Sequence, residues 1–306
     1  MKNLLLIFVV LNGLLISSST KSQVFISEDF DKDQLKGGTT YVLMNDPEAP
    51  ASQPFIAIYK KYWTLSPIDF IRYDEIINYM EPNNTFLGLQ WYATSSELSG
   101  STHLYLSLWK PEDQNLNKKP RKIADIEVQE LAHIEIFPDR HLLINNTDVF
   151  KMEYHGEDHL RNWGPGFLKN QLQMLTKYLE IGEERKLYEE TSNAEALKEL
   201  KGQTLYIPEY SLLKWGSFSG TERKRSESEL MGKYEYNYKV LSNEDLNEMI
   251  LNSDQSFYYL VYVKGSTDKF VTVINSGNGE IIYHVYTPAS YAVDAKDIKS
   301  LLKEIK

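Results

Sequence analysis

The stretch LKGGTTYV at residues 35–42 returns as LKGQTLYI at residues 200–207, and five of the eight positions are identical. In both copies a glycine, Gly37 or Gly202, follows a short polar stretch that can close a helix, and a strand-like alternation follows the glycine. Glycine adopts without strain the left-handed backbone conformation that such a helix end requires. Two copies of the same helix-to-strand junction predict an internal repeat.

The predicted elements that follow the two copies come in the same order. After the first copy they are a strand at 55–63, a helix beginning at Ser66, strands at 86–93, 103–109 and 132–137, and a helix through Leu168, Leu172, Leu175 and Leu179. After the second copy they are a strand at 234–240, a helix beginning at Ser242, strands at 257–263, 270–274 and 281–286, and a helix through Ile298, Leu301, Leu302 and Ile305. Alternation of apolar and polar residues marks the strands, and helical spacing marks the closing helices.

The two predicted helices that begin at Ser66 and Ser242 share a capping pattern. Ser66 precedes Asp69 by three residues, and Ser242 precedes Asp245 by three residues. The serine hydroxyl accepts a hydrogen bond from an unpaired backbone amide, and the acid complements the positive end of the helix. The shared pattern extends the comparison between the two copies.

We therefore expect an α+β (αβ) fold made by tandem duplication of a strand-strand-helix-strand-strand-strand-helix unit. Each unit forms a mixed sheet with helices packed on it, because each helix has one apolar stripe that must be buried. Residues 1–22 form a signal peptide, residues 23–190 the first repeat with an extra hairpin insertion, and residues 191–306 the second repeat. The alternative is that two αβ segments share this order without being repeats.

The N-terminal segment has the layout of a secretory signal. Lys2 is followed by an apolar run, residues 4–16, which is shorter than the roughly 20 residues that a membrane span requires. The small residues Thr20 and Ser22 place cleavage between Ser22 and Gln23. We expect a secreted or periplasmic protein with no membrane contact after cleavage. The alternative is an uncleaved anchor.

The chain contains no cysteine. Disulfides, a thiol nucleophile and a thiolate metal site are therefore excluded. A bacterial lipoprotein needs a cysteine directly after its cleavage site, so the protein is not a lipoprotein.

The chain is acidic, with a formal net charge of −10, and loss of Lys2 and Lys21 with the leader makes the charge −12. Nucleic-acid binding needs a basic face that displaces counterions from phosphate, so we expect no nucleic-acid partner. The basic run Arg223-Lys224-Arg225 has three glutamates nearby and is interpreted as a solvated loop. The alternative is a contact with an anionic partner.

The segment His155-Gly156-Glu157-Asp158-His159 places two imidazoles and two carboxylates within five residues. Two histidines four apart on a helix can share Zn²⁺. Because Gly156 weakens a helix and the order His-Glu-x-x-His is not met, we expect solvated side chains and no metal site. The other histidines are expected to be structural: His103, His133, His141 and His284.

No motif assigns a catalytic residue or a cofactor. The stretch Gly216-Ser217-Phe218-Ser219-Gly220 has Phe218 where a hydrolase elbow needs its nucleophile. Gly37-Gly38 leads into a strand and not into a helix start, which phosphate binding requires. Three adjacent acid pairs are interpreted as solvated faces: Asp74 with Glu75, Glu183 with Glu184, and Glu189 with Glu190.

Aromatic residues are frequent, with 21 Tyr and 5 Trp. Exposed rings would suit sugars or a partner protein. Most of them lie inside predicted strands, which favours packing in the core. The residues concerned are Tyr59, Tyr62, Trp63, Trp91, Tyr92, Trp109, Trp163 and Trp215.

These observations favour an exported, non-enzymatic binding or interaction protein of unknown ligand, built from two αβ repeats. A protein or a glycan is the expected kind of partner, since no catalytic motif is present. The alternative is an envelope hydrolase that uses acidic residues in a cleft between the repeats.

The leader generates a direct prediction. When the full chain is produced in a host with a secretory pathway, the exported protein should begin at Gln23 and lack residues 1–22. N-terminal sequencing and intact mass of the exported material measure this. Retention of Met1 on exported or membrane-bound protein would contradict it and favour the uncleaved anchor.

Overall fold

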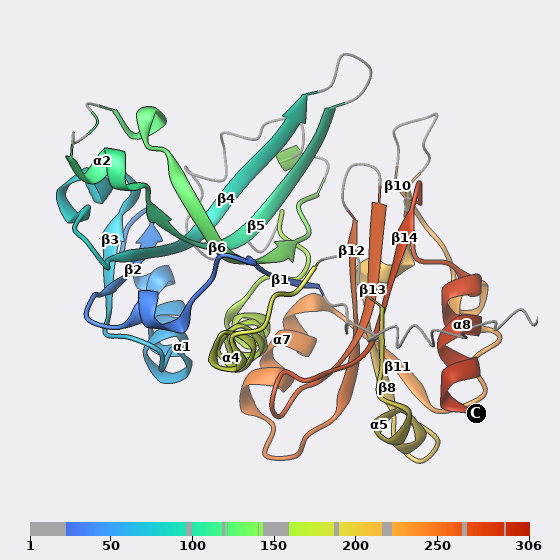
Figure 1. The fold of residues 1–306 in the computed structure, drawn as a ribbon. Helices are drawn as coiled ribbons and strands as arrows, with labels where there is room; N and C mark the ends of the chain where they lie inside the picture. Colours follow the sequence, from blue (N-terminus) through green and yellow to red (C-terminus); the bar gives the residue numbers. More distant parts are fainter. Residues whose placement is uncertain are drawn as a thin grey trace, which may run out of the picture.

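The computed structural model describes residues 23–95, 100–117, 120, 122–139, 141–142, 159–186, 190–215, 222–264, 268–290 and 292–306. Two six-stranded mixed sheets dominate this part of the chain, and helices pack on both of them (Figure 1). The expected α+β fold class is confirmed. The leader lies outside the described residues, as does the expected hairpin at residues 140–152 except for residues 141–142, which are helical.

The first sheet contains β1 (Val24–Ile26), β2 (Thr40–Met44), β3 (Ile68–Arg72), β4 (Thr85–Ser95), β5 (Gly100–Pro111) and β6 (Val128–Ile136). Their order in the sheet is β1-β6-β5-β4-β2-β3. Strand β2 runs parallel to both β3 and β4, and the other pairs are antiparallel. The strands predicted at 86–93, 103–109 and 132–137 are therefore confirmed as β4, β5 and β6.

The second sheet contains β7 (Thr191–Ser192), β8 (Leu205–Pro208), β11 (Tyr238–Leu241), β12 (Tyr258–Lys264), β13 (Asp268–Asn275) and β14 (Ile281–Pro288). Their order is β11-β8-β12-β13-β14-β7, with β8 parallel to β11 and β12 and the other pairs antiparallel. Read from the opposite end, this order and these directions match the first sheet strand for strand. Two sheets of one topology fit a tandem arrangement of two units.

Helices and 3-10 segments connect the strands. With the first sheet come η1 (Lys32–Leu35), η2 (Pro50–Ser52), α1 (Gln53–Tyr62), η3 (Tyr73–Tyr79), α2 (Asp113–Asn117), η4 (Ile123–Asp125) and α4 (Pro165–Ile181). With the second come α5 (Ala194–Glu199), η6 (Glu209–Leu212), α6 (Glu227–Met231), α7 (Asn243–Asn252) and α8 (Ala295–Ile305), and a small ribbon of β9 (Leu213–Trp215) and β10 (Glu222–Lys224). No helix within the described ranges has both the length and the apolar character that crossing a membrane demands.

The predicted strand at residues 55–63 is wrong, because these residues lie in helix α1. Pro54 stands in the first turn, where its missing amide hydrogen costs nothing. The buried residues of α1 follow helical spacing and not alternation: Phe55, Ile56, Ile58 and Tyr59. Their aromatic and β-branched types favour a strand, and their spacing overrides that preference.

The predicted helix start at Ser66 is also wrong, since residues 68–72 form the edge strand β3. Ser66 Oγ lies 2.6 Å from Thr40 Oγ1 and accepts a hydrogen bond from Trp63 Nε1 at 3.0 Å. This serine therefore joins the end of α1 to the start of β2 and caps no helix. The order strand, strand, helix survives as β2, β3 and η3, with α1 inserted between the two strands.

The matching prediction in the second unit is confirmed. Ser242 Oγ accepts from the backbone amide of Asp245 at 3.0 Å, and α7 begins at the next residue. At the repeated junction, Gly37 has a positive φ of 79°, as its role at a helix end requires, whereas Gly202 is not among the glycines with positive φ. The two junctions are thus alike in sequence and differ in backbone conformation.

Helix α4 lies between α1 and α7 and connects the two units (Figure 1). Of its 17 residues, 13 are buried. Lys169 Nζ donates to the carbonyl of Ile250 at 2.9 Å, and the Gly166 amide donates to Asn247 Oδ1 at 2.8 Å. Both acceptors belong to α7, so hydrogen bonds as well as apolar contacts tie the units together.

The contact between α4 and α7 depends on the absence of a side chain at Gly166. A Cβ there would lie 2.1 Å from the Asn247 carbonyl oxygen, so Gly166→Ala should lower the free energy of unfolding by about 1–3 kcal/mol. Gly202→Ala is the matched control, because the nearest atom to its Cβ would be 3.9 Å away. Urea denaturation followed by circular dichroism measures both variants. Equal stability of the two variants would contradict the close approach.

Candidate functional site

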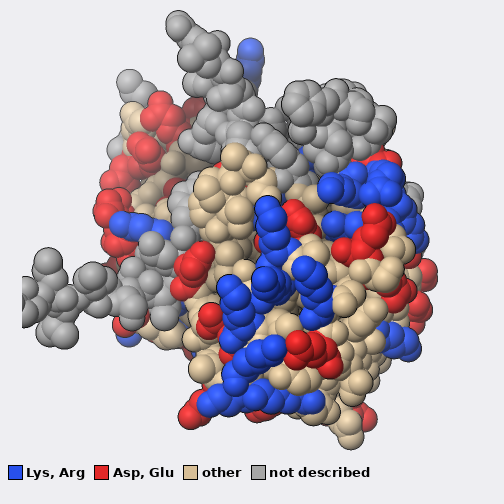
Figure 2. Space-filling model, turned by 90° about the vertical axis from the view of Figure 1, so that its right-hand side faces the viewer, with Lys and Arg blue, Asp and Glu red and all other residues tan. Residues whose placement is uncertain are grey.

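A groove with a volume of about 390 Å³ lies between α8 and the residues that follow α6. It is lined by Gly232, Lys233, Tyr234 and Glu235 on one side and by Lys299, Leu302, Lys303 and Lys306 on the other. We call it the lysine groove. Figure 2 shows the face of the molecule that carries α8, on which Lys and Arg side chains gather. Four lysines and one glutamate thus line a single groove of a chain whose formal net charge is −10.

Helix α8 presents lysines to the groove because its sequence is amphipathic. Its apolar residues recur at helical spacing and are buried: Ile298, Leu301, Leu302 and Ile305. Lys299 and Lys303 stand one turn apart on the exposed side. The first turn is held by Asp297, whose Oδ2 accepts from the Asp294 amide and from Lys269 Nζ, each at 2.6 Å.

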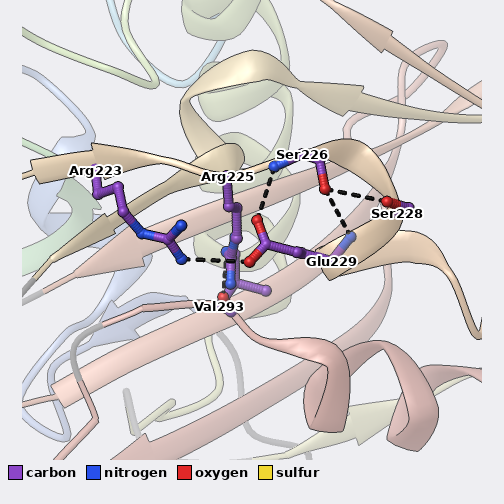
Figure 3. Close-up of polar contacts among 6 residues, drawn as sticks. All are labelled: Arg223, Arg225, Ser226, Ser228, Glu229 and Val293. Carbon is purple, nitrogen blue, oxygen red and sulfur yellow. Dashed lines mark hydrogen bonds and ion pairs between the residues drawn. The ribbon is translucent and has the colours of Figure 1, made fainter.

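The opposite wall is positioned by Arg225, which directly follows β10 (Figure 3). Its buried guanidinium donates to the carbonyl of Ser211 at 2.8 Å and to the carbonyl of Val293, just before α8. Helix α6 then starts with a reciprocal cap, in which Ser226 Oγ accepts from the Glu229 amide and Glu229 Oε2 accepts from the Ser226 amide at 2.9 Å. Burial lowers the pKa of Arg225, although a guanidinium stays protonated at neutral pH. One charged side chain therefore links the start of α6 to the start of α8.

Within the part of the chain that the structure describes, three of the groove lysines have no acidic partner. Among the described residues, no carboxylate lies within 4.0 Å of the ammonium group of Lys233, Lys299 or Lys303. Lys306 differs, because its Nζ lies 3.2 Å from Glu235 Oε1. An ammonium group without a carboxylate beside it attracts an anion, and screening by salt limits this attraction to short distances.

Tyr234 lines the groove with a largely buried ring. It is 7% exposed, and its buried hydroxyl has no hydrogen-bond partner within the part of the chain that the structure describes. Burial raises the pKa of Tyr234 far above the usual range, and Tyr236 adds to this shift. The hydroxyl therefore stays neutral and keeps its proton.

The run Arg223-Lys224-Arg225 does not make the basic surface. Arg223 Nη2 lies 3.3 Å from Glu229 Oε1, and Lys224 Nζ lies 3.4 Å from Glu209 Oε2, so adjacent acids offset both charges. The interpretation as a solvated loop is right about the exposure of these two side chains but wrong about the backbone, because both residues lie in strand β10. It is wrong for Arg225, which is buried and holds two backbone carbonyls.

Three of the four single histidines, His103, His133 and His284, lie in strands of the sheets, whereas His141 is exposed and lies outside them. His103 Nδ1 lies 3.1 Å from Glu135 Oε1; burial opposes protonation, but the carboxylate outweighs burial and raises the pKa of His103. His133 Nδ1 lies 3.0 Å from Glu130 Oε1, at an angle unsuited to a hydrogen bond. His284 is fully buried. The positions of the three histidines in strands agree with structural roles.

Of the cluster at residues 155–159, the structure describes only His159. Its Nδ1 lies 2.8 Å from Asp139 Oδ2, and its ring stacks on His141 with centroids 4.5 Å apart. Across the described ranges, no group of three or more His, Cys, Asp or Glu residues is placed to hold a metal ion. The stretch Gly216–Gly220 lies outside the described residues.

The adjacent acid pairs lie at the surface where they are described. Asp74 pairs with Arg72 at 3.2 Å, and Glu75 Oε2 accepts from the Arg72 amide at 3.0 Å. Glu184 lies 3.1 Å from Lys186. These contacts are local and place no two carboxylates across a cleft.

Two pockets lie where the units meet. One of about 250 Å³ is lined by Leu160, Trp163, Gly164, Ser242, Asn243, Glu244 and Asn247. A narrower one is lined by Phe137, Arg161, Tyr210, Leu213, Glu222, Tyr262 and Lys264. The lining of each pocket contains one carboxylate, whereas hydrolysis by paired acids needs two that face each other.

The aromatic residues noted in the sequence are mainly core residues. Tyr59, Trp63, Trp109 and Trp163 are at most 6% exposed. Trp109 stacks on Phe86 with ring centroids 4.6 Å apart. Packing of the core therefore accounts for these rings, and they form no exposed platform.

Sequence reasoning missed the lysine groove. Lys233 follows α6, whereas Lys299 and Lys303 belong to α8, and only the fold brings them together. The available signal was the recurrence of lysine at positions 296, 299, 303 and 306 between buried apolar residues. That spacing marks one helix face as basic.

No known protein family, curated protein or solved structure matches this chain. The geometry and the charges of the groove are therefore the features from which a function can be inferred.

Arg225 should be essential to the walls of the groove. Arg225→Met would leave the carbonyls of Ser211 and Val293 without their donor, so the free energy of unfolding should fall by about 2–4 kcal/mol. Arg223→Met is the matched control and should leave stability nearly unchanged, since its ion pair is exposed. Thermal and urea unfolding compare them. Equal losses in the two variants would show that Arg225 is no anchor.

Proposed function

We propose that this chain is an exported, non-enzymatic binding protein made of two αβ units, and that its ligand is anionic and occupies the lysine groove. The observation that carries the proposal is the gathering of four lysines around one groove in a chain of net charge −10. A uniformly acidic surface would repel such a ligand. Local charge, not net charge, decides what binds at a distance of a few ångströms.

The arrangement of lysines has a cost that ligand binding would relieve. Lys299 and Lys303 are four residues apart on α8, where like charges repel and weaken a helix slightly. Neither has a carboxylate among the described residues that offsets this repulsion. An anion placed between them would replace repulsion by attraction, which supports a binding role for this face.

An envelope hydrolase with acids in a cleft between the units is the alternative function. Paired-acid hydrolysis requires carboxyl groups about 5–10 Å apart across a cleft. The pockets at the unit boundary contribute Glu244 in one case and Glu222 in the other. Glu222 also lies 3.6 Å from Arg161, so it is already part of an ion pair. The binding function has the stronger support.

Export is inferred from the leader at residues 1–22, and it determines which partners the groove would meet. Outside the cytoplasm these are envelope or secreted proteins and glycans. Binding to either would proceed without chemical change of the ligand.

The test uses residues 23–306 and two anionic polymers, poly-L-glutamate and heparin. At least one should bind the wild-type protein by isothermal titration calorimetry, with affinity that falls as salt rises. Lys299→Glu with Lys303→Glu should abolish binding, whereas Lys60→Glu with Lys61→Glu, on exposed α1 positions of the other unit, should not. Unchanged binding by the α8 variant, or none by the wild type, would refute the proposal.

A further inference from the structure

The basic surface continues beyond the groove as a stripe along α8. Lysines at 296, 299, 303 and 306 recur every three or four residues, which extends positive charge over about 15 Å at a rise of about 1.5 Å per residue. Lys201 adds a further ammonium group, since its Nζ donates to the carbonyl of Lys306 at 3.3 Å. A single small anion would meet one or two of these groups. The whole stripe fits a ligand that is extended and carries several charges.

The cations on this face suit carboxylates spaced along a chain. Guanidinium groups bind phosphate and sulfate with two parallel hydrogen bonds, but Arg223 is paired with Glu229 and Arg225 is buried on backbone carbonyls. A duplex nucleic acid carries one charge per about 1.7 Å and needs a broadly basic surface. Here Glu235 lies inside the groove, and the chain as a whole is acidic. Widely spaced negative charges suffer less from this repulsion than dense ones.

The lining of the groove disfavours a sugar polymer. Sugar rings bind proteins by stacking on exposed aromatic faces. Tyr234 is the one aromatic residue in the described lining, and its ring is 7% exposed. It therefore offers little surface for stacking.

The spacing of the lysines suits an extended peptide. Leu302 also lines the groove, but it is only 6% exposed and, like Tyr234, offers little apolar surface. An extended peptide places alternate side chains about 6.6–6.8 Å apart on one face, which flexible lysine side chains one turn apart can match. An extended acidic peptide can therefore pair its carboxylates with successive lysines of the stripe.

We infer that the lysine groove binds an extended acidic segment of a partner polypeptide, with carboxylates paired to the lysines of α8. This inference rests on the proposed function and names the class of its ligand. The segment runs along α8, parallel to the stripe. Ion pairs give it salt-dependent affinity.

The experiment compares blocked peptides by fluorescence anisotropy on residues 23–306. The peptide EELEELEE should bind, and its neutral counterpart QQLQQLQQ should bind about tenfold more weakly or worse. Lys299→Glu with Lys303→Glu should weaken EELEELEE by at least about tenfold, whereas Lys60→Glu with Lys61→Glu should leave it unchanged. Circular dichroism of the variants confirms that each is folded.

Other ligands separate this inference from the function on which it rests. Heparin or single-stranded oligodeoxythymidine that binds through Lys299 and Lys303, in the absence of peptide binding, would overturn the acidic peptide and keep the anion-binding function. No binding by any of the three classes would overturn both. Peptide binding that survives charge reversal on α8 would place the peptide elsewhere and refute the inference.

Discussion

The architecture depends on the burial of α4 between two sheets. Polar groups in a buried helix must find partners, and Lys169 and Asn170 of α4 find them in the second unit. Asn170 Oδ1 accepts from Tyr259 Oη at 2.9 Å, and Asn170 Nδ2 donates to the Ser276 carbonyl at the same distance. Lys169 reaches the last turn of α7. A shift of α4 would break these hydrogen bonds together, so the polar groups determine the position of the helix. Apolar packing supplies most of its area of contact.

Because α4 and α7 pack between the two units, α8 covers the opposite side of the second sheet. Figure 1 shows α7 and α8 on opposite sides of that sheet. The first side faces the other unit and is buried, whereas α8 has one apolar face on the sheet and one face in solvent. The lysines of the stripe therefore lie on α8, a helix that the packing of the two units leaves partly exposed.

The sequence predicted elements well where spacing and residue type agree. In α8, apolar residues at helical positions follow an acidic first turn, and in β12 to β14 β-branched and aromatic residues dominate runs bounded by turns. In α1 the two signals conflict, and the strand-like types of Ile56 and Ile58 led to the wrong element. The groove depends on tertiary contacts, since Arg225 joins α6 to α8 through backbone carbonyls that no motif reveals. The groove lysines come from two segments that are far apart in the sequence, so neither segment alone reveals the cluster.

In an acidic protein with a basic groove, the electrostatic force on an anionic ligand depends on its distance from the groove. At physiological ionic strength the screening length is about 8 Å, so an approaching anion outside that range feels little of either charge. Within that range the lysines on the groove walls dominate, because three of them lack an acidic neighbour among the described residues. A short extended segment that enters the groove gains their attraction, while a large polyanion must also lie over the acidic surface around it. The same distribution of charge therefore favours a short acidic segment over a long polyanion, which binds through the part of it that enters the groove.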